Sequence, residues 1–196
     1  MTNRRHLPQV DAGLLLRAYG QGWFPMAHRD GQIHWHDPDP RAIFPLDRIA
    51  PGRTMERVIR SGHLSCTVDR CFAEVMRACA QREETWITPE LIQAYVELHR
   101  MGHAHSVETW YNGELAGGIY GVQVGGAFFG ESMFTRSSNA GKVAFHHLAH
   151  HLRRRGFTLF DSQYANAFTE QLGVVEIPRS EFKRLLATAS SLPVGF

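Results

Sequence analysis

One stretch of the sequence, residues 103–134, constrains the fold more than any other. It reads HAHSVETWYNGELAGGIYGVQVGGAFFGESMF, three runs rich in apolar, β-branched and aromatic residues, separated by Asn112-Gly113 and Gly125-Gly126. Asn-Gly favours a two-residue hairpin turn because both positions adopt positive φ, and a glycine pair permits a second tight reversal. The stretch therefore predicts consecutive strands in an antiparallel meander.

Helices are predicted on both sides of this meander. Asp11 can cap a helix through LLLRAY, while Thr88 and Pro89 fit the start of a second helix that ends at Gly102. Asp69 is predicted to cap a third helix over DRCFAEVMRACA. Further helices are expected at 54–60, at 139–155, near 169–172 and from residue 180.

The remaining segments are predicted to be extended. Residues 31–47 contain Pro38, Pro40 and Pro45, which indicate an extended, loop-like passage. Runs of β-forming residues predict strands at 64–69, 157–162 and 174–177. The alternation of these strands with helices predicts a mixed α/β (α+β) domain.

Composition excludes several classes of protein. The 196 residues are 43% hydrophobic and 20% charged, as in globular domains, with a net charge of +2 that requires no polyanionic partner. No apolar run reaches the ~18 residues of a membrane span, and the start lacks a signal-peptide core, so we expect a cytoplasmic protein. The cysteines lack C-x-x-C spacing and are expected to be small buried thiols. They are Cys66, Cys71 and Cys79.

The histidines do not form a recognisable metal motif. Two pairs on the predicted helix 139–155 have i, i+4 spacing, but no acid completes an H-E-x-x-H pattern. His34, His36 and Asp37 also lack a fixed further ligand. We therefore predict no metal site and no cofactor. The helical pairs are His146 with His150 and His147 with His151.

Three arginines align on one face of the predicted helix 54–60 and the residue before it. Arg53, Arg57 and Arg60 recur at spacings of four and three without an equal set of acids. Such a face can bind phosphates through its guanidinium groups. A solvated surface explains the same pattern, so the spacing alone leaves both interpretations open.

Glu131 and Asp161 each lie in a strand-like run dominated by apolar residues. An unpaired carboxylate is costly to bury there, so each acid must be paired structurally or be used by a site. Gln163 follows Asp161 by two residues, which places both side chains on the same side of a continuing strand. Asp161 and Gln163 are therefore candidates for holding a polar substrate.

Several longer segments give the chain a family resemblance. YGQGWFPM, HDPDPRAIFPLD, TWITPELIQAYVELHRMGHAHSVETW, GGIYGVQVGGAFFGESMF, NAGKVAF, DSQ and LGVVEIPR occur in this order. Together they resemble the leucyl/phenylalanyl-tRNA-protein transferase family over roughly residues 14–186. Ordered agreement over many segments is far more specific than any single motif.

The resemblance implies a fold and an activity. It implies a small N-terminal domain, residues 1–40, followed by a GNAT-like aminoacyl-transfer domain, residues 41–196, and we expect a monomer. The implied reaction moves leucine or phenylalanine, with methionine as a further donor residue, from aminoacyl-tRNA to proteins with N-terminal arginine or lysine. That transfer marks the acceptor for degradation by the N-degron pathway.

The resemblance also implies roles for individual residues. Asp161 and Gln163 match the family's proposed catalytic pair, and Glu131 matches an acid that attracts the cationic acceptor or positions the donor. Arg53, Arg57 and Arg60 match a basic cluster for the tRNA backbone. The aminoacyl-tRNA 3′ end and its side-chain pocket are expected to involve Trp86, Tyr95, Ile119, Phe128, Met133, Leu148, Met26 and Trp35.

The sequence departs from the family pattern at four positions. Met26 and His36 stand where relatives often have tryptophan, so stacking on the terminal adenine is expected to depend on Trp23 or Trp35. Gly141 replaces a frequent serine at the entry of a helix, and Phe168 replaces a frequent histidine.

Two alternatives remain open from sequence. A CoA-dependent GNAT acetyltransferase would need a pyrophosphate loop of the form Q/R-x-x-G-x-G/A, which TRSSNAGKVAF does not match. A relative that binds tRNA without catalysis would keep the arginine face but lack the chemistry.

Overall fold

The computed structural model describes residues 10–28 and 30–196 and shows a mixed α/β fold. A seven-stranded sheet has the order β4-β5-β6-β7-β8-β3-β9, and a separate hairpin pairs β1 with β2. Among the strand pairs of residues 10–28 and 30–196, only β7–β8 is parallel. The strands are β1 (Phe24–Ala27), β2 (Ile33–His36), β3 (Arg41–Ile43), β4 (Ser65–Val68), β5 (Ala104–Tyr111), β6 (Glu114–Val124), β7 (Ala127–Thr135), β8 (Leu159–Gln163) and β9 (Val175–Ile177). The predicted fold class, a mostly antiparallel mixed sheet, is confirmed.

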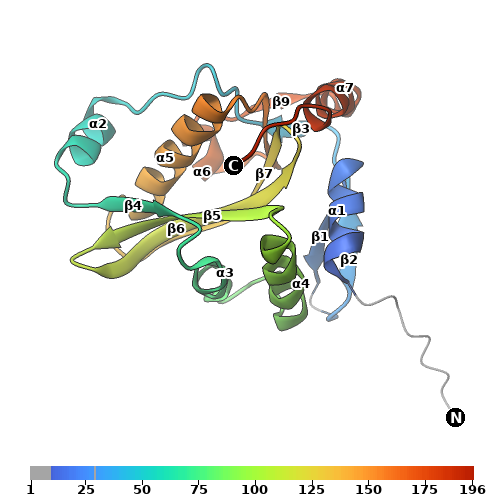
Figure 1. Cartoon of the computed structure of the whole chain (residues 1–196), viewed down its shortest axis with the longest axis horizontal. Coiled ribbons are helices and arrows are strands. Elements are labelled where there is room, and N and C mark those ends of the chain that lie inside the picture. Colours follow the sequence, from blue (N-terminus) through green and yellow to red (C-terminus); the bar gives the residue numbers. More distant parts are fainter. Residues whose placement is uncertain (1–9, 29) are drawn as a thin grey trace, which may run out of the picture.

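Helices cover both faces of the sheet (Figure 1). α5 packs on one face, α3 and α4 pack on the other, and α1 lies against α4 beside the β1–β2 hairpin. No helix of residues 10–28 and 30–196 has the length and apolar character to cross a membrane. The helices are α1 (Ala12–Gly20), α2 (Arg53–Arg60), α3 (Phe72–Ala80), α4 (Pro89–Arg100), α5 (Ala140–Arg155), α6 (Ala167–Gln171) and α7 (Arg179–Ser190).

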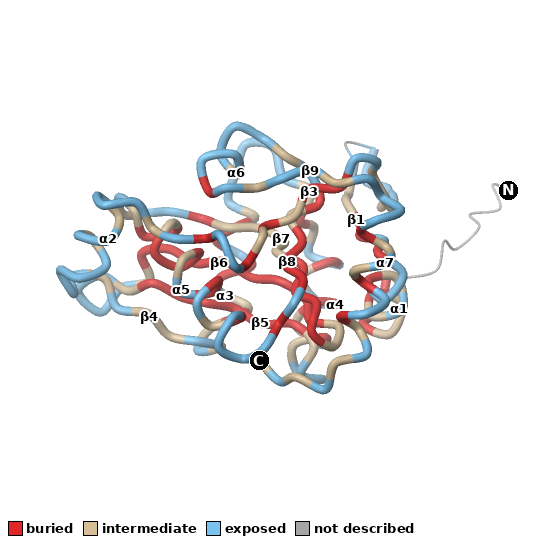
Figure 2. The backbone as a smooth tube through the Cα atoms, turned by 90° about the horizontal axis from the view of Figure 1, so that it is seen from above, coloured by how far each residue is buried: buried red, intermediate tan, exposed pale blue. Residues whose placement is uncertain are grey.

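The sheet separates two hydrophobic layers. Side chains alternate along β7, so Phe128 packs with Phe145 of α5 while Phe129 packs with Tyr19 of α1. The buried residues follow the strands through the middle of the molecule (Figure 2). Burial of these two layers is the main stabilising contribution to the fold.

The central meander has the predicted turns. β5, β6 and β7 pair antiparallel in sequence order. Asn112 and Gly113 have φ values of 50° and 83°, and Gly125 has a φ of 54°. Positive φ is the physical reason for the Asn-Gly pair and for Gly125.

Two predicted helix caps are confirmed. The side chain of Asp11 accepts a hydrogen bond from the backbone N–H of Leu14 at 2.7 Å. Thr88 accepts one from the N–H of Leu91 at 3.3 Å, and Pro89 occupies the first turn. In each case the cap satisfies a backbone donor that the helix itself leaves free.

The prediction that Asp69 caps a helix is wrong. α3 begins at Phe72, and its N-cap position is Cys71. Asp69 has a φ of 55°, and its carboxylate accepts the N–H of Ser106 at 2.8 Å and pairs with His105 Nδ1 at 2.7 Å. Contacts with β5 therefore outcompete the local capping interaction.

The prediction of a loop-like passage at 31–47 is only half right. The backbone is extended, but Ile33–His36 forms β2, and Arg41–Ile43 forms β3 between β8 and β9 of the main sheet. The prolines lie outside both strands, where they remove no hydrogen bond from a ladder. Long-range pairing with β8 and β9 makes β3 a strand.

Candidate active site

A β-bulge in β7 presents Glu131. Gly130 pairs with Gly121 and Ser132 pairs with Tyr120, so Glu131 is the extra residue that the register shift leaves unpaired. A bulge changes the direction of the side chain that it carries and is frequent beside active sites. The acid is therefore presented by a local irregularity of the strand.

A tight turn at the end of β8 directs Gln163 to Glu131. The N–H of Tyr164 donates to the carbonyl of Ser162 at 2.7 Å, which closes a γ-turn around Gln163 with φ at 60°. From there Gln163 Nε2 donates to Glu131 Oε1 at 2.9 Å. The continuing strand predicted at Gln163 is thus corrected, because the chain turns at this residue.

Asp161 lies one layer deeper, in an ion pair with Arg41 of β3. Arg41 Nε and Nη2 donate to the two carboxylate oxygens at 2.9 and 2.7 Å, and neither side chain is exposed. Asp161 Oδ1 also accepts the backbone N–H of Gln163 at 3.2 Å. Asp161 therefore touches the site through the backbone of Gln163.

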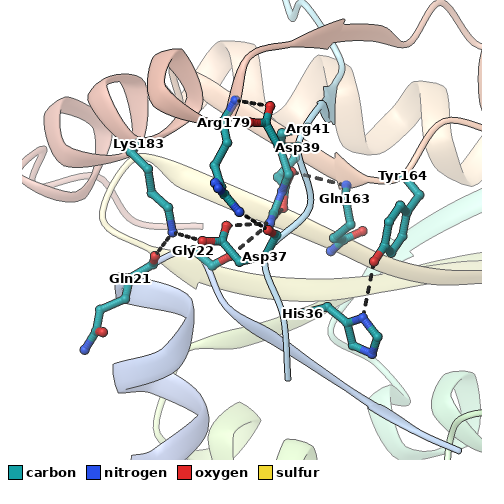
Figure 3. A network of polar contacts seen from close by, with 11 residues as sticks. Gln21, Gly22, His36, Asp37, Asp39, Arg41, Gln163, Tyr164, Arg179 and Lys183 are labelled. Atoms are coloured by element: carbon teal, nitrogen blue, oxygen red, sulfur yellow. Dashed lines mark hydrogen bonds and ion pairs between the residues drawn. The ribbon is translucent and has the colours of Figure 1, made fainter. Parts of the chain in front are cut away.

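A polar network fixes the segment that supplies Arg41 (Figure 3). Lys183 pairs with Asp37 at 2.9 Å, and Arg179 donates to Asp39 through its backbone N–H at 3.0 Å. Arg179 Nη1 also donates to the carbonyl of Asp37 at 2.9 Å. α7 thereby holds the passage between β2 and β3 against the sheet.

Glu131 has an unusual protonation equilibrium. Burial raises its pKa from 4.5 to about 8, and the charge of Asp161 acts in the same direction. Hydrogen bonding by Tyr19 and Tyr95 and the charge of Arg41 oppose this rise. Tyr95 donates to Glu131 Oε2 at 3.3 Å and lies 2.5 Å from the hydroxyl of Tyr19. The carboxyl group therefore changes charge near neutral pH.

Glu131 and Gln163 both line a pocket of about 300 Å³. Core side chains beneath α5 give the pocket an apolar side, and Trp86 and Met26 line it as well. Of the residues predicted from sequence, it brings together Glu131, Gln163, Met26, Trp86, Ile119 and Met133.

Four residues expected in the pocket lie elsewhere, which corrects that expectation. Phe128 and Leu148 are fully packed between the sheet and α5. Tyr95 is buried beneath Glu131 and reaches it only through its hydroxyl group. Trp35 packs against the other hydrophobic layer. Because side chains alternate along a strand, it is the neighbouring His36 that contacts Tyr164.

Sequence reasoning missed much of the lining. Alternation along β8 could have identified Phe160, since it precedes Asp161 and must face α5. The others come from loops and helices distant in sequence, and no local pattern marks them. The missed residues include Phe44, Arg82, Phe145, Phe160, Tyr164, Phe168 and Leu172.

The predicted arginine face lies apart from the pocket lining. Arg53, Arg57 and Arg60 are all exposed on α2, which packs on α5 at one end of the molecule (Figure 1). Arg60 forms a 3.9 Å ion pair with Glu56 on the same helix. The three guanidinium groups are accessible to a large ligand.

Two departures from the family pattern have a structural setting. A Cβ on Gly141 would lie 2.3 Å from Thr135 Oγ1 and 2.9 Å from the carbonyl of Phe134, so the start of α5 approaches β7 too closely for a serine here. His36 Nδ1 lies 3.2 Å from the hydroxyl of Tyr164, a residue that lines the pocket.

One group of potential metal ligands occurs among residues 10–28 and 30–196, with ligand atoms within 4.8 Å: Asp69, His99 and His105. Protein groups already bind these atoms. His105 Nδ1 pairs with Asp69 at 2.7 Å, and His99 Nδ1 lies 2.7 Å from the carbonyl of Ala104. The cluster is therefore satisfied by its own hydrogen bonds.

The fold and the site together define a mixed α/β protein whose pocket combines a carboxyl group, a side-chain amide and an apolar side. A family model described as leucyl/phenylalanyl-tRNA protein transferase matches residues 43–187, and the model of that family's N-terminal domain matches residues 9–39. The chain belongs to the leucyl/phenylalanyl-tRNA–protein transferase family.

Individual relatives agree with this assignment. A leucyl/phenylalanyl-tRNA–protein transferase from Gloeobacter violaceus is 53% identical over 93% of this chain and 95% of its own length. One from Salinibacter ruber is 53% identical over 90% of this chain and 78% of its own length. A solved structure of L-PGS from Bacillus licheniformis is similar over 77% of this chain and 50% of its own chain, at 13% identity and with a TM-score of 0.45.

Proposed function

We propose that the chain transfers leucine or phenylalanine, and methionine as a further donor residue, from aminoacyl-tRNA to proteins that begin with arginine or lysine. The product would enter the N-degron pathway of degradation. The observation that carries the proposal is the meeting of Glu131 and Gln163 in a pocket with an apolar side. The polar pair suits an amine, and the apolar side suits the donor side chain.

The reaction converts an ester into an amide. The amine nitrogen bonds to the ester carbonyl carbon, the bond from that carbon to the ribose oxygen breaks, and one amine proton ends on the ribose hydroxyl. An α-ammonium group with a pKa of ~8 must first lose a proton. Glu131, with a pKa of about 8, matches that group, so we assign it the role of attracting the ammonium and taking its proton.

Gln163 and Asp161 have different roles in this mechanism. Gln163 donates through Nε2 to Glu131, which leaves its Oε1 to orient the incoming amine. Asp161 is a positioning residue, because it holds the backbone N–H of Gln163 and is itself neutralised by Arg41. Neither residue is required to act as a base.

The donor would span the pocket. Ile119 and Met133 lie on the apolar side, where a leucyl or phenylalanyl group would bury its surface and a charged side chain would pay desolvation. Trp86 would stack on the terminal adenine, an interaction of about 1–3 kcal/mol. Met26 lines the pocket in place of a second tryptophan platform.

The exposed arginines of α2 would hold the tRNA backbone. Contacts with phosphates explain how several tRNAs are accepted without base reading. Replacing Arg53, Arg57 and Arg60 by alanine should weaken tRNA binding and reduce its salt dependence by about one power of salt concentration per lost contact.

We also propose a GNAT-like core, a domain boundary at residue 40, a monomeric state and a cytoplasmic location.

Transfer of labelled leucine from Leu-tRNA tests this function. Matched peptides beginning with Arg, Lys, Asp or Met serve as acceptors, and label is expected on the Arg and Lys peptides only. Gln163→Ala should lower transfer by about a hundredfold in a folded protein. Turnover of acetyl-CoA without use of Leu-tRNA would overturn the proposal, as would salt-dependent tRNA binding without peptide product.

A further inference from the structure

A second arginine at the site has no counterion among the described residues. Arg82 lies in the loop between α3 and α4, is exposed, and lines the same pocket as Trp86, four residues further along the loop. In residues 10–28 and 30–196 no acid lies within 4.0 Å of its guanidinium group. Arg41, by contrast, is neutralised by Asp161.

Arg82 is anchored by one nitrogen only. Its Nη2 donates to the hydroxyl of Ser132 at 2.8 Å and to the carbonyl of Met133 at 2.6 Å. These two residues directly follow Glu131 in the bulged strand, so the guanidinium group is fixed beside the proposed site of chemistry. Its Nη1 and Nε have no hydrogen-bond partner within the described part of the chain, which leaves two donors for a ligand.

The position of Arg82 indicates which phosphate of the donor it would contact. The terminal base is assigned to Trp86 and the ester to Glu131 and Gln163, so the nucleoside between them carries its own 5′-phosphate close to both. α2 packs with α5 on the face of the sheet opposite α3 and α4 (Figure 1), so Arg53, Arg57 and Arg60 reach another part of the donor. A planar guanidinium group is suited to two phosphate oxygens.

We propose that Arg82 binds the phosphate on the 5′ side of the donor's terminal adenosine. This inference rests on the proposed function, because it assumes an aminoacylated nucleotide in the pocket. It assigns to the 81–88 loop a two-part grip on that nucleotide, with Trp86 on the base and Arg82 on the phosphate. The bulge of β7 holds the arginine through Ser132 and Met133.

Two minimal donors test the assignment. Leucyl-adenosine and leucyl-adenosine 5′-phosphate differ only in the phosphate, and each is offered with an Arg peptide. Arg82→Ala should lower kcat/KM for the phosphorylated donor and for Leu-tRNA by about ten- to a hundredfold. It should leave leucyl-adenosine within about twofold of the unaltered protein, because that donor has no phosphate to lose.

A matched control separates this effect from surface charge. Arg136 is also exposed and hydrogen-bonds to the carbonyl of Leu115 and to Gln81, but it lies outside the pocket lining. Arg136→Ala should leave kcat/KM unchanged for both minimal donors. Arg82→Lys, which keeps the charge and loses the fork, should give an intermediate loss for the phosphorylated donor only.

Equal losses for both minimal donors would overturn the inference, since Arg82 would then only support the bulge. Equilibrium binding gives a readout that is independent of catalysis. Adenosine 5′-phosphate should bind more tightly than adenosine, and Arg82→Ala should remove the difference. If the protein transferred nothing yet showed this preference, the proposed function would fail while the phosphate site would stand. No preference for the phosphate would contradict the site directly.

Discussion

Two glutamates of the sheet, Glu108 and Glu131, have different surroundings. Glu108 lies in the regular β4–β5 region and is unexposed. The hydroxyl groups of Thr67 and Ser106 donate hydrogen bonds to it at 2.6 and 2.5 Å, and the backbone N–H groups of residues 70 and 71 add two longer hydrogen bonds. Glu131 sits on a bulge, accepts bonds from Gln163 and Tyr95, and faces a pocket.

The difference separates a structural acid from an acid available to a ligand. Four donors satisfy the carboxylate of Glu108, and Glu108 does not line the pocket that Glu131 faces. Glu131 has fewer donors, a pKa raised to about 8 and a surface open to the pocket. A cation that enters the pocket would stabilise the ionised carboxylate of Glu131, for which the protein itself provides fewer donors.

The largest predicted effect concerns a further acid of the sheet, the buried Asp161. Asp161→Asn leaves the buried guanidinium group of Arg41 without its counterion, which should lower the free energy of unfolding by about 3–5 kcal/mol. Denaturant unfolding measures it. A second replacement, Arg41→Met, should restore part of the loss because it removes the unpaired charge. A loss below about 1 kcal/mol for the single variant would show that the pair is not a structural support.

Glu108→Ala should have the next largest effect. It leaves the hydroxyl groups of Thr67 and Ser106 without their acceptor and should cost about 3 kcal/mol of stability. Below its unfolding temperature the variant should transfer leucine at the unaltered rate, because the change is remote from the pocket. A specific loss of kcat in the folded variant would break the contrast between the two glutamates.

Glu131→Gln should have a smaller, pH-dependent effect on stability. The folded protein keeps the proton of Glu131 up to a pKa of about 8, whereas the unfolded chain loses it near 4.5. This contribution to stability is complete below pH 4.5 and is lost as pH rises to 8. The variant lacks this loss, so it should match the unaltered protein at pH 4 and exceed it by about 2 kcal/mol at pH 9. Parallel stability curves would contradict a raised pKa.

Local chemistry explains what could be predicted from the sequence. The Asn112-Gly113 turn and the caps at Asp11 and Thr88 depend on residues close in the chain, and each forms as predicted. Asp69 shows the limit of this reasoning, because a contact with Ser106 across strands replaces the local cap.

The directions in which the side chains of the site point could not be predicted from the sequence, because they depend on strand register and on partners distant in the chain. The bulge at Glu131 exists only relative to β6, and the γ-turn at Gln163 interrupts a strand that alternation would continue. Arg41 is 120 residues from Asp161, and no sequence pattern links the two. Which acid is neutralised internally and which faces the pocket therefore emerges only from the fold.

The titration of Glu131 tests the central claim most directly. Carbon NMR of labelled glutamate side chains, assigned with Glu131→Gln, gives its pKa with and without a peptide that begins with arginine. The pKa of Glu131 should be about 8 in the free protein. Bound peptide should bring a clear decrease, because the ammonium group stabilises the carboxylate. A pKa near 4.5 that the peptide does not change would contradict the role assigned to Glu131.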